Sequence, residues 1–460
     1  MATPPPLKVM IVGAGIGGLM LAILLQKQNV DYEIYERALT VKHFGSAMSL
    51  GPNVLPVFEQ LGLLEELKNI SHPCFNLDIY TEDSNRIVSM DIGSREGDMD
   101  YDLYVFGRPE FHELLLSKVP KEKIHFGKRV LSVGQSDHGA MIRCADGTTY
   151  DGDILIGADG AYSAVRQSLY ERLAKDGKLP KSDTLNISAD YTCMVGITEA
   201  LDPEKYAVAK DDISHFAAVI AGGKPLSWTV ISIPGQRFAW CAVVQLSAQQ
   251  NNTTFRNSEW GPESIDPVIA MFADLPVPYG GTMGDLINST PKELISNVYL
   301  EEKIFETWSH GRIALLGDAV HKMLPTTGQG AINAIEDAVI IANGIYDMTA
   351  NSQEEIKALF QVYRAQRYSH AKMQVENSAV AGKLFFGQTL VENIVRKIIL
   401  SYMPKWFEKS KLTKAAGYRP QATFLPLSPK RGTLTVTPQK MSKRYRKEQA
   451  AKGKQDEATG

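Results

Sequence analysis

The stretch that decides the fold is Gly13-Ala14-Gly15-Ile16-Gly17-Gly18, which comes directly after the apolar run Val9 to Val12. It opens a segment whose apolar positions fit one packed helix face, and a second strand-like run, Tyr32 to Glu36, follows. Glycines at 13, 15 and 18 let the backbone turn tightly and approach a pyrophosphate, whose charge meets the free N–H groups of the helix start. The pattern predicts a dinucleotide-binding βαβ unit.

Glu36 closes the second strand of this unit. A carboxylate at that position can accept hydrogen bonds from both hydroxyls of an adenosine ribose. An unphosphorylated ribose is therefore implied, as in FAD or NAD. The alternative is a glycine-rich turn in any α/β protein, but the ordered succession of strand, glycines, helix and acid favours the nucleotide site.

Composition excludes several classes of protein. The chain has 460 residues, 44% of them hydrophobic and 22% charged, so we expect an ordinary globular protein of two or three domains, or one domain with a large insertion. A net charge of −3 predicts no nucleic-acid partner. The four cysteines form no CxxC pair, so neither a disulfide framework nor a metal site is expected. Without a signal-like N-terminus, the protein is predicted to be cytoplasmic and not secreted.

The succession of segments predicts an α/β fold with an inserted sheet. Strand-like and helix-like segments alternate to about residue 170, aromatic alternating runs such as Trp228 to Ile233 dominate between about 185 and 300, and residues 311–350 return to strand then helix. We therefore expect a Rossmann-like domain in two parts, residues 7–180 and 301–390, with a mainly antiparallel β-sheet substrate domain, residues 181–300, inserted between them.

The C-terminal region is expected to differ from the rest. Residues 391–438 are interpreted as a helical packing segment, and residues 439–460, which are rich in Lys and Arg, as a disordered basic tail. The apolar run Ile394 to Phe407 ends in Lys405 and Trp406, so it could instead be an interfacial anchor that gives peripheral contact with an intracellular membrane. Both interpretations stay open from sequence alone.

Two later segments decide which nucleotide is bound. The first is Gly157-Ala158-Asp159-Gly160-Ala161-Tyr162-Ser163-Ala164-Val165-Arg166, and the second is Gly317-Asp318-Ala319-Val320-His321-Lys322-Met323-Leu324-Pro325, which leads to Gly328-Gln329-Gly330-Ala331-Ile332-Asn333 and Glu336-Asp337. With these motifs the sequence resembles the class A flavoprotein monooxygenases, the para-hydroxybenzoate-hydroxylase-like family. Within that family it is similar to fungal secondary-metabolite monooxygenases of the indole-diterpene and meroterpenoid type. The resemblance covers roughly residues 7–385 and also Tyr418 to Pro426.

The resemblance implies that the Rossmann-like domain binds FAD and that the protein is an NAD(P)H-consuming monooxygenase. In such enzymes reduced nicotinamide delivers hydride to flavin N5, O2 adds at C4a, and the hydroperoxide passes one oxygen atom to a hydrophobic small molecule, by aromatic hydroxylation or alkene epoxidation. Because no second GxGxxG occurs, NADPH or NADH is expected to dock transiently. A flavin-dependent oxidase or reductase and a redox-inactive flavin-binding protein stay open as alternatives, and the sequence does not predict an oligomeric state.

Asp318, Gly330 and Ala331 are predicted to contact the flavin end of FAD. Asp318 ends the strand Ile313 to Leu316 and can accept hydrogen bonds from ribityl hydroxyls. Gly330 and Ala331 place bare N–H groups at a helix start, which would stabilise negative charge on the pyrimidine edge of the ring. The resemblance further associates Asp159, together with Arg166, with the FAD pyrophosphate and the nicotinamide cofactor.

Other positions follow from the resemblance. It implies that Arg108 reaches the flavin phosphates or ribityl chain and that Ser49 lies near the ring, where the family usually has Gly or Ala. Tyr191, Trp228 and Trp240 are candidates for lining the substrate pocket, although such aromatic residues are more often plain core. We identify no catalytic base. His321 is interpreted as a polar wall residue and not as an acid or base.

Overall fold

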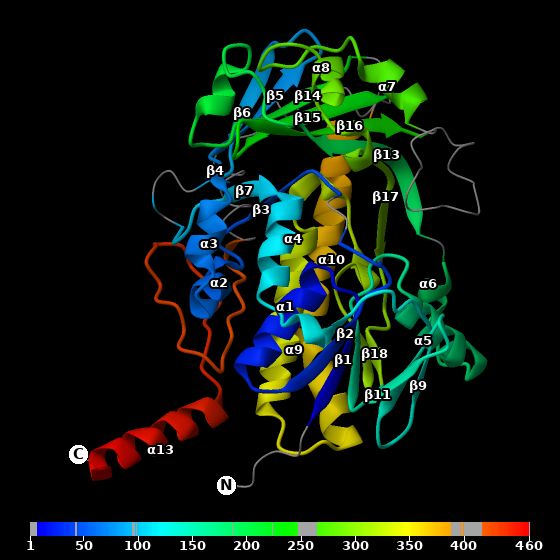
Figure 1. The fold of residues 1–460 in the computed structure, drawn as a ribbon, viewed down its shortest axis with the longest axis vertical. Helices are drawn as coiled ribbons and strands as arrows, with labels where there is room; N and C mark the ends of the chain where they lie inside the picture. Colours follow the sequence, from blue (N-terminus) through cyan, green and yellow to red (C-terminus); the bar gives the residue numbers. More distant parts are fainter. Residues whose placement is uncertain are drawn as a thin grey trace.

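The computed structural model describes residues 7–41, 44–93, 97, 99–185, 187–222, 224–246, 265–387, 396, 399 and 416–459. Two sheets dominate it, one low in the view of Figure 1 and one across the top, and helix α10 (Gln353–Phe386) runs between them. This mixed α/β arrangement confirms the predicted fold class.

The lower sheet has six strands in the order β18-β19-β12-β1-β2-β8. Its bounds are β1 Lys8–Val12, β2 Asp31–Tyr35, β8 Ile124–His125, β12 Ile154–Gly157, β18 Ser309–His310 and β19 Ile313–Leu315. The five strands from β19 to β8 run parallel to one another. The edge strand β18 is antiparallel to β19. β12 is buried along its whole length, as a strand covered by helices on both faces should be.

Helices α1 (Ile16–Lys27) and α9 (Gly330–Asp347) lie against each other beside this sheet. Residues 17–25 of α1 are all buried, which explains the continuous apolar character of that segment. A Cβ atom at Gly17 would lie 2.5 Å from Leu316 Cδ1 and 3.2 Å from Ala334 Cβ. Glycine therefore permits the close approach of α1 to α9.

The upper sheet has eight strands in the order β20-β17-β13-β16-β15-β14-β5-β6. Its bounds are β5 Asn76–Thr81, β6 Arg86–Asp91, β13 Ser188–Ile197, β14 Phe216–Ile220, β15 Leu226–Ile233, β16 Arg237–Gln245, β17 Ser296–Ile304 and β20 His321–Lys322. Every pairing is antiparallel except that of β14 with β5. Helices α7 (Asp266–Phe272) and α8 (Met283–Asn288) cover its outer face (Figure 1).

The boundaries of this sheet differ from the predicted substrate domain, residues 181–300. The hairpin β5–β6 comes from inside the predicted first part of the Rossmann-like domain, and β17 continues past residue 300. The reason is that strand periodicity shows which face of a strand is buried but not which sheet the strand joins.

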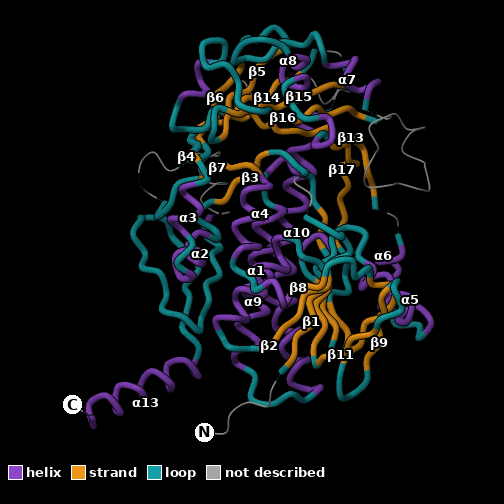
Figure 2. Tube along the Cα trace, in the orientation of Figure 1, coloured by secondary structure: helices purple, strands orange, loops and turns teal. Residues whose placement is uncertain are grey.

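Smaller elements complete the lower body (Figure 2). Two three-stranded sheets, β11-β10-β9 and β3-β7-β4, flank it. Their strands are β3 Ala47–Leu50, β4 His72–Pro73, β7 Tyr104–Gly107, β9 Val130–Gln135, β10 Ala140–Cys144 and β11 Thr149–Gly152, and the accompanying helices are α2 Leu55–Leu61, α3 Leu64–Asn69, α4 Arg108–Ser117, α5 Ala164–Lys175 and α6 Lys181–Thr184.

The C-terminal region departs from its prediction. Residues 418–438, expected to be helical, contain no helix and pack as extended chain, with Ala422 N donating to Gln60 Oε1 at 2.9 Å and Gln60 Nε2 donating to Ala422 O at 3.0 Å. Residues 443–459, expected to be disordered, form helix α13. Two contacts stabilise its start: Arg444 pairs with Glu448 at 2.8 Å along the helix, and Glu448 accepts from the Tyr346 hydroxyl at 2.5 Å.

The predicted membrane contact falls in a part of the chain that lies largely outside the described residues. Of Ile394 to Phe407, only Arg396 and Ile399 are described. Among the helices of the described ranges, none is long and apolar enough to cross a membrane.

Candidate cofactor site

Three parallel strands carry the three sequence motifs to one edge of the lower sheet. Val12 of β1 pairs with Gly157 of β12, and Gly157 pairs with Leu315 of β19, so the strands end side by side. The glycine loop, the Asp159 loop and the Asp318 loop begin at these ends. The carboxyl edge of a parallel sheet is where such folds bind nucleotides.

Gly13 and Gly18 make the first loop sterically possible. Gly13 has a φ of 105°, and a Cβ atom there would lie 2.5 Å from the carbonyl oxygen of Ala158. A Cβ atom at Gly18 would lie 2.1 Å from the carbonyl oxygen of Gly13. A side chain at Gly13 would push the first loop away from the second, and a side chain at Gly18 would push α1 away from the first loop.

Helices α1 and α9 begin without a side-chain cap, and open space lies before both. A Cβ atom at Gly15 or at Gly330 would meet no atom within 4 Å. By contrast, Ser163 caps α5 and Ser352 caps α10. The first N–H groups of α1 and α9, including those near Gly330 and Ala331, are therefore available to an anionic or hydrogen-bonding ligand.

Glu36 lies beside the glycine loop, as predicted. Its carboxylate accepts from Ala14 N and from Ala38 N, both at 2.8 Å. Each oxygen keeps a second lone pair for the hydroxyl groups of a ribose. Sequence reasoning missed His112 of α4, whose Nε2 lies 2.7 Å from Ala14 O and supports the same loop.

The structure brings Arg108 and Asp318 together and adds Lys322. Lys322 Nζ lies 2.6 Å from Asp318 Oδ2. Burial lowers the pKa of Arg108, and the nearby Asp318 carboxylate acts in the opposite direction. Arg108 Nη1 donates to Phe44 O at 2.8 Å, which orients its side chain. The spacing of Lys322 four residues after Asp318 is the signal that could have revealed this ion pair from sequence.

Asp159 and Arg166 connect two loops of the site. Asp159 accepts from Ser163 Oγ at 2.5 Å and from Ala164 N at 2.7 Å, at the start of α5. Burial raises its pKa, and these hydrogen bonds oppose the rise. Arg166 donates to Ala319 O at 2.7 Å and to Ala161 O at 2.6 Å. In this structure Arg166 therefore braces the Asp318 loop, and Asp159 holds the start of α5, from which Arg166 projects.

Ser49 lies next to the turn that precedes α9. A Cβ atom at Gly328, whose φ is 64°, would lie 3.3 Å from Ser49 Oγ. Just before β3, Ser46 Oγ donates to Trp240 O at 3.3 Å, and Cys241 Sγ lies 3.5 Å from Ser46 Oγ. This loop therefore connects the site with the inner face of the upper sheet.

Two of the three predicted pocket residues lie elsewhere. Trp228 and Trp240 are fully buried on the outer face, where their Nε1 atoms donate to Pro276 O and Thr290 Oγ1. Their prediction as pocket residues was wrong because alternation along β15 and β16 does not show which face meets the site. Tyr191 does lie on the inner face, packed with Leu324 and Phe386.

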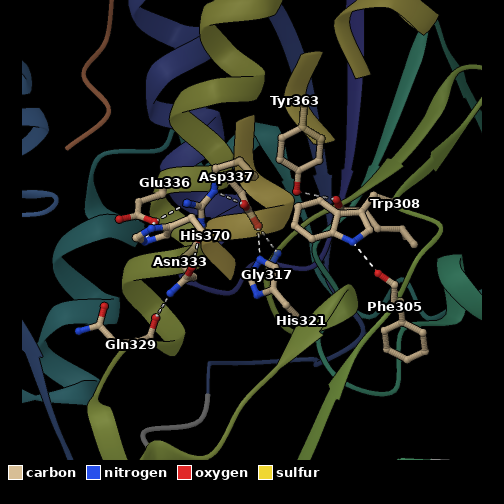
Figure 3. A network of polar contacts seen from close by, with 12 residues as sticks. Phe305, Trp308, Gly317, His321, Gln329, Asn333, Glu336, Asp337, Tyr363 and His370 are labelled. Atoms are coloured by element: carbon tan, nitrogen blue, oxygen red, sulfur yellow. Dashed lines mark hydrogen bonds and ion pairs between the residues drawn. The ribbon is translucent and has the colours of Figure 1, made fainter. Parts of the chain in front are cut away.

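A fully buried ionic network lies behind the Asp318 loop (Figure 3). Asp337 of α9 accepts from Gly317 N at 2.9 Å, from Arg367 Nε at 2.8 Å and lies 2.6 Å from His321 Nε2. These contacts hold the pKa of Asp337 at about 2 against the effect of burial. His321 is thus the partner of a buried carboxylate and not a wall residue.

The second acid of the network, Glu336, is less well compensated. Arg367 Nη1 lies 2.6 Å from its Oε2, and His370 Nε2 lies 3.5 Å from the same oxygen. Burial raises the pKa of Glu336 to about 7, with Arg367 opposing the rise and Asp337 adding to it. Burial, helped by Arg367, lowers the pKa of His370 to about 3.

Comparison with known proteins identifies the family. The sequence profile described as FAD binding domain matches residues 6–260 and 282–378, most of the chain. The chain belongs to this family. The FAD-dependent monooxygenase ausM of Penicillium brasilianum is 28% identical over 94% of this chain and 92% of its own length, and the FAD-dependent monooxygenase andE of Emericella variicolor is 30% identical over 86% and 83%.

The fold of this FAD-dependent monooxygenase agrees with solved structures. Klebsiella pneumoniae HpxO, complexed with FAD and uric acid, superposes with a TM-score of 0.72 at 21% identity, over 91% of this chain and 98% of HpxO. CtdE, in complex with FAD and a substrate, gives a TM-score of 0.67 at 20% identity over 89% and 97%. The resemblance expected from the motifs, to class A flavoprotein monooxygenases of fungal type, is confirmed.

Proposed function

We propose that this monooxygenase transfers one oxygen atom from O2 to a hydrophobic polycyclic or prenylated small molecule, with NADPH or NADH as reductant. The observation that carries the proposal is the shared edge of the neighbouring parallel strands β2, β1, β12 and β19. The glycine loop follows β1, and Glu36, Asp159 and Asp318 follow the ends of β2, β12 and β19. Bound FAD supplies the chemistry, namely hydride acceptance and O2 activation. The protein supplies binding, orientation and exclusion of water.

The described residues fit FAD at two ends of one site. At α1, we assign the pyrophosphate to the N–H groups of the helix start between Gly15 and Gly18, while Gly13, whose N–H donates to Tyr35 O, shapes the loop. We assign the adenosine ribose to Glu36, whose carboxylate is held in place by two backbone donors. The open space before Gly15 leaves room for the pyrophosphate to reach the helix start.

At α9, we assign the ribityl chain to Asp318 and Arg108, and the ring to the helix start at Gly330 and Ala331, with Ser49 beside it. The uncapped N–H groups of α9 would stabilise negative charge on the ring when it is reduced. Arg166 keeps the Asp318 loop in position through Ala319 O, and Asp159 fixes the start of the helix that carries Arg166.

The substrate pocket is assigned to the space between this ring position and the inner face of the upper sheet. The inner face there is apolar: Tyr191, Val195 and Val298 of the sheet belong to one apolar cluster with Leu324, which follows β20, and Phe386 at the end of α10. Such a surface binds a hydrophobic molecule and keeps water from the reaction. The resemblance of the sequence to fungal secondary-metabolite monooxygenases supports a polycyclic or prenylated substrate, and fungal FAD-dependent monooxygenases are among the relatives of this chain.

The test uses the purified holoenzyme under anaerobic conditions. FAD reduction by NADPH and by NADH is followed with and without phenolic and prenylated candidate substrates. The proposal predicts that FAD reduction is faster in the presence of a hydrophobic substrate than in its absence. Absence of NAD(P)H oxidation with every candidate would instead favour a passive flavin-binding protein.

We further propose that the enzyme is cytoplasmic and that Ile394 to Phe407 contacts a membrane surface. The apolar run with Lys405 and Trp406 at its end supports this contact. Liposome pelleting of the full chain and of a full-length variant that carries Lys405→Glu and Trp406→Ala tests it, because a truncation would also remove the C-terminal segment that packs against Gln60. Equal pelleting of the two proteins would contradict the membrane contact.

A further inference from the structure

Two buried acids share one guanidinium behind the candidate flavin position. Glu336 and Asp337 follow each other on α9, and Arg367 of α10 contacts both, at 2.6 Å and 2.8 Å. All three side chains have 0% exposure. In a dry interior an ion pair is tolerated only when each charge is compensated, so one cation cannot hold two carboxylates equally well.

The contacts show which acid keeps its charge. Both oxygens of Asp337 accept hydrogen bonds, from Gly317 N, His321 Nε2 and Arg367 Nε. Glu336 has the Arg367 ion pair and the more distant His370, and its Oε1 has no hydrogen-bond partner among the described residues. The buried charge of Glu336 is therefore the less well compensated of the two. Protonation removes an unfavourable charge at Glu336, whereas Asp337 keeps its charge.

The surroundings of Glu336 contain no further cation that compensates it among the described residues. From α10 it faces Arg367 and His370, from its own helix Asp337, and from the C-terminal segment the Tyr418 ring, which stacks on His370 with centroids 4.2 Å apart. His321 is engaged with Asp337. A new charge nearby should therefore change the protonation of Glu336 more than that of Asp337.

We propose that Glu336 takes up a proton from solvent when the bound FAD is reduced. The inference rests on the proposed position of the flavin ring at the α9 start. Six residues of helix separate Gly330 from Glu336, about 9 Å at 1.5 Å per residue. At about 10 Å and an effective dielectric constant of about 20, an added negative charge raises the pKa of Glu336 by about one.

The proton balance of the step is simple. NAD(P)H supplies the hydride and solvent supplies the proton, which converts the Glu336 carboxylate to a carboxylic acid. His370 is the route, because its side chain is 10% exposed while Glu336 is fully buried, and the two lie 3.5 Å apart. Glu336 thus acts through its charge and not by contact with the reacting atoms. Its protonation offsets the negative charge that the ring gains on reduction.

The test counts protons taken up per FAD during anaerobic reduction, with an indicator dye in weakly buffered holoenzyme between about pH 6 and pH 9. If the pKa of Glu336 moves from about 7 to about 8, wild type takes up about half a proton more per FAD near pH 7.5 than Glu336→Gln does. Glutamine keeps the shape of the protonated acid. Equal proton counts in the two proteins at every pH would overturn the proposal.

A matched control and a second measurement keep the result decisive. Glu302→Gln removes another carboxyl whose pKa burial raises, on β17, and should leave the proton count unchanged. If Glu336→Gln does not fold, infrared spectroscopy of wild type should show a protonated carboxyl that ionises near pH 7 and persists to higher pH after reduction. A band that does not move on reduction contradicts the inference. Failure of FAD to bind or be reduced would instead contradict the proposed function.

Discussion

At the scale of single residues, the glycines of the first loop do different work. Gly13 has a left-handed backbone and no room for a side chain, whereas Gly15 has an extended backbone and open space before it. The first glycine is required by the fold itself. Gly15 leaves room for the ligand that binds in this space, which we assign to the pyrophosphate.

Gly13→Ala and Gly15→Ala should therefore fail in different ways. Gly13→Ala is expected to lower the free energy of unfolding by about 1–3 kcal/mol or more, because alanine is strained at that φ and meets Ala158 O. Gly15→Ala should leave stability nearly unchanged but weaken FAD binding. Urea unfolding and FAD titration of both variants check this. Equal loss of stability in the two would contradict the separation.

Asp318→Ala tests the assigned ribityl position. Loss of hydrogen bonds to a charged acceptor should weaken FAD binding about tenfold to a hundredfold, as measured by fluorescence titration of the apoprotein. Asp146→Ala, which removes an exposed partner of Lys128 far along the chain, serves as control. Retention of full FAD affinity in Asp318→Ala would show that the ribityl chain binds elsewhere.

At the scale of elements, the buried network joins parts that the sequence separates. Asp337 links the loop at Gly317 and His321 to α9, and Arg367 links α9 to α10. Tyr363 of α10 adds a hydrogen bond to Leu315 O, at 3.0 Å, at the end of β19. The position of the Asp318 loop therefore depends on the packing of two helices.

Asp337→Asn should cost about 3–5 kcal/mol of the free energy of unfolding, because it leaves Arg367 short of a buried countercharge and His321 without its carboxylate partner. Asp347→Asn, at the last residue of α9, removes only the charge that accepts from Ser442 and should cost less than about 1 kcal/mol. Chemical denaturation of the two variants checks the difference. Similar small losses in both would mean that the network is not a stabilising element.

Elements with strong local signals could be predicted from sequence. The βαβ unit, Glu36 and the Asp318 loop follow from glycines, apolar runs and motif spacing. What the sequence could not show depends on long-range partners: β5 and β6 join the upper sheet, Trp228 and Trp240 face its outer side, and α13 forms through contact with Tyr346. Arg367 was missed because an ion pair between distant segments leaves no periodic pattern. Lys322 lies only four residues after Asp318, a local spacing that could have revealed that pair.

At the scale of the whole molecule, the network makes stability depend on pH. Glu336 has a pKa of about 7 when folded, above its ordinary value of 4.5. The folded protein holds this proton more tightly than the unfolded chain does. Its contribution to stability is therefore fully present below about pH 4.5 and is lost as the pH rises through about 7.

The substitution Glu336→Gln should remove the loss of stability that accompanies a rise in pH. Between pH 5 and pH 8 wild type is expected to lose on the order of 2–3 kcal/mol through Glu336, and the variant should not. His370, whose pKa is lowered to about 3, acts in the opposite direction below about pH 6.5 in both proteins and cancels in the comparison. The free energy of unfolding of wild type and of Glu336→Gln, measured at the two pH values, tests this prediction. Parallel pH profiles for the two proteins would contradict the assigned proton.

The central claim is that FAD bound at the lower sheet and a hydrophobic substrate bound under the upper sheet meet at the start of α9. The most direct measurement is turnover under ¹⁸O2 with NAD(P)H and a substrate that accelerates flavin reduction, followed by mass spectrometry of the product. The account predicts one ¹⁸O atom per product molecule and one NAD(P)H oxidised for each. Unlabelled product, or NAD(P)H consumed with only hydrogen peroxide released, would contradict it.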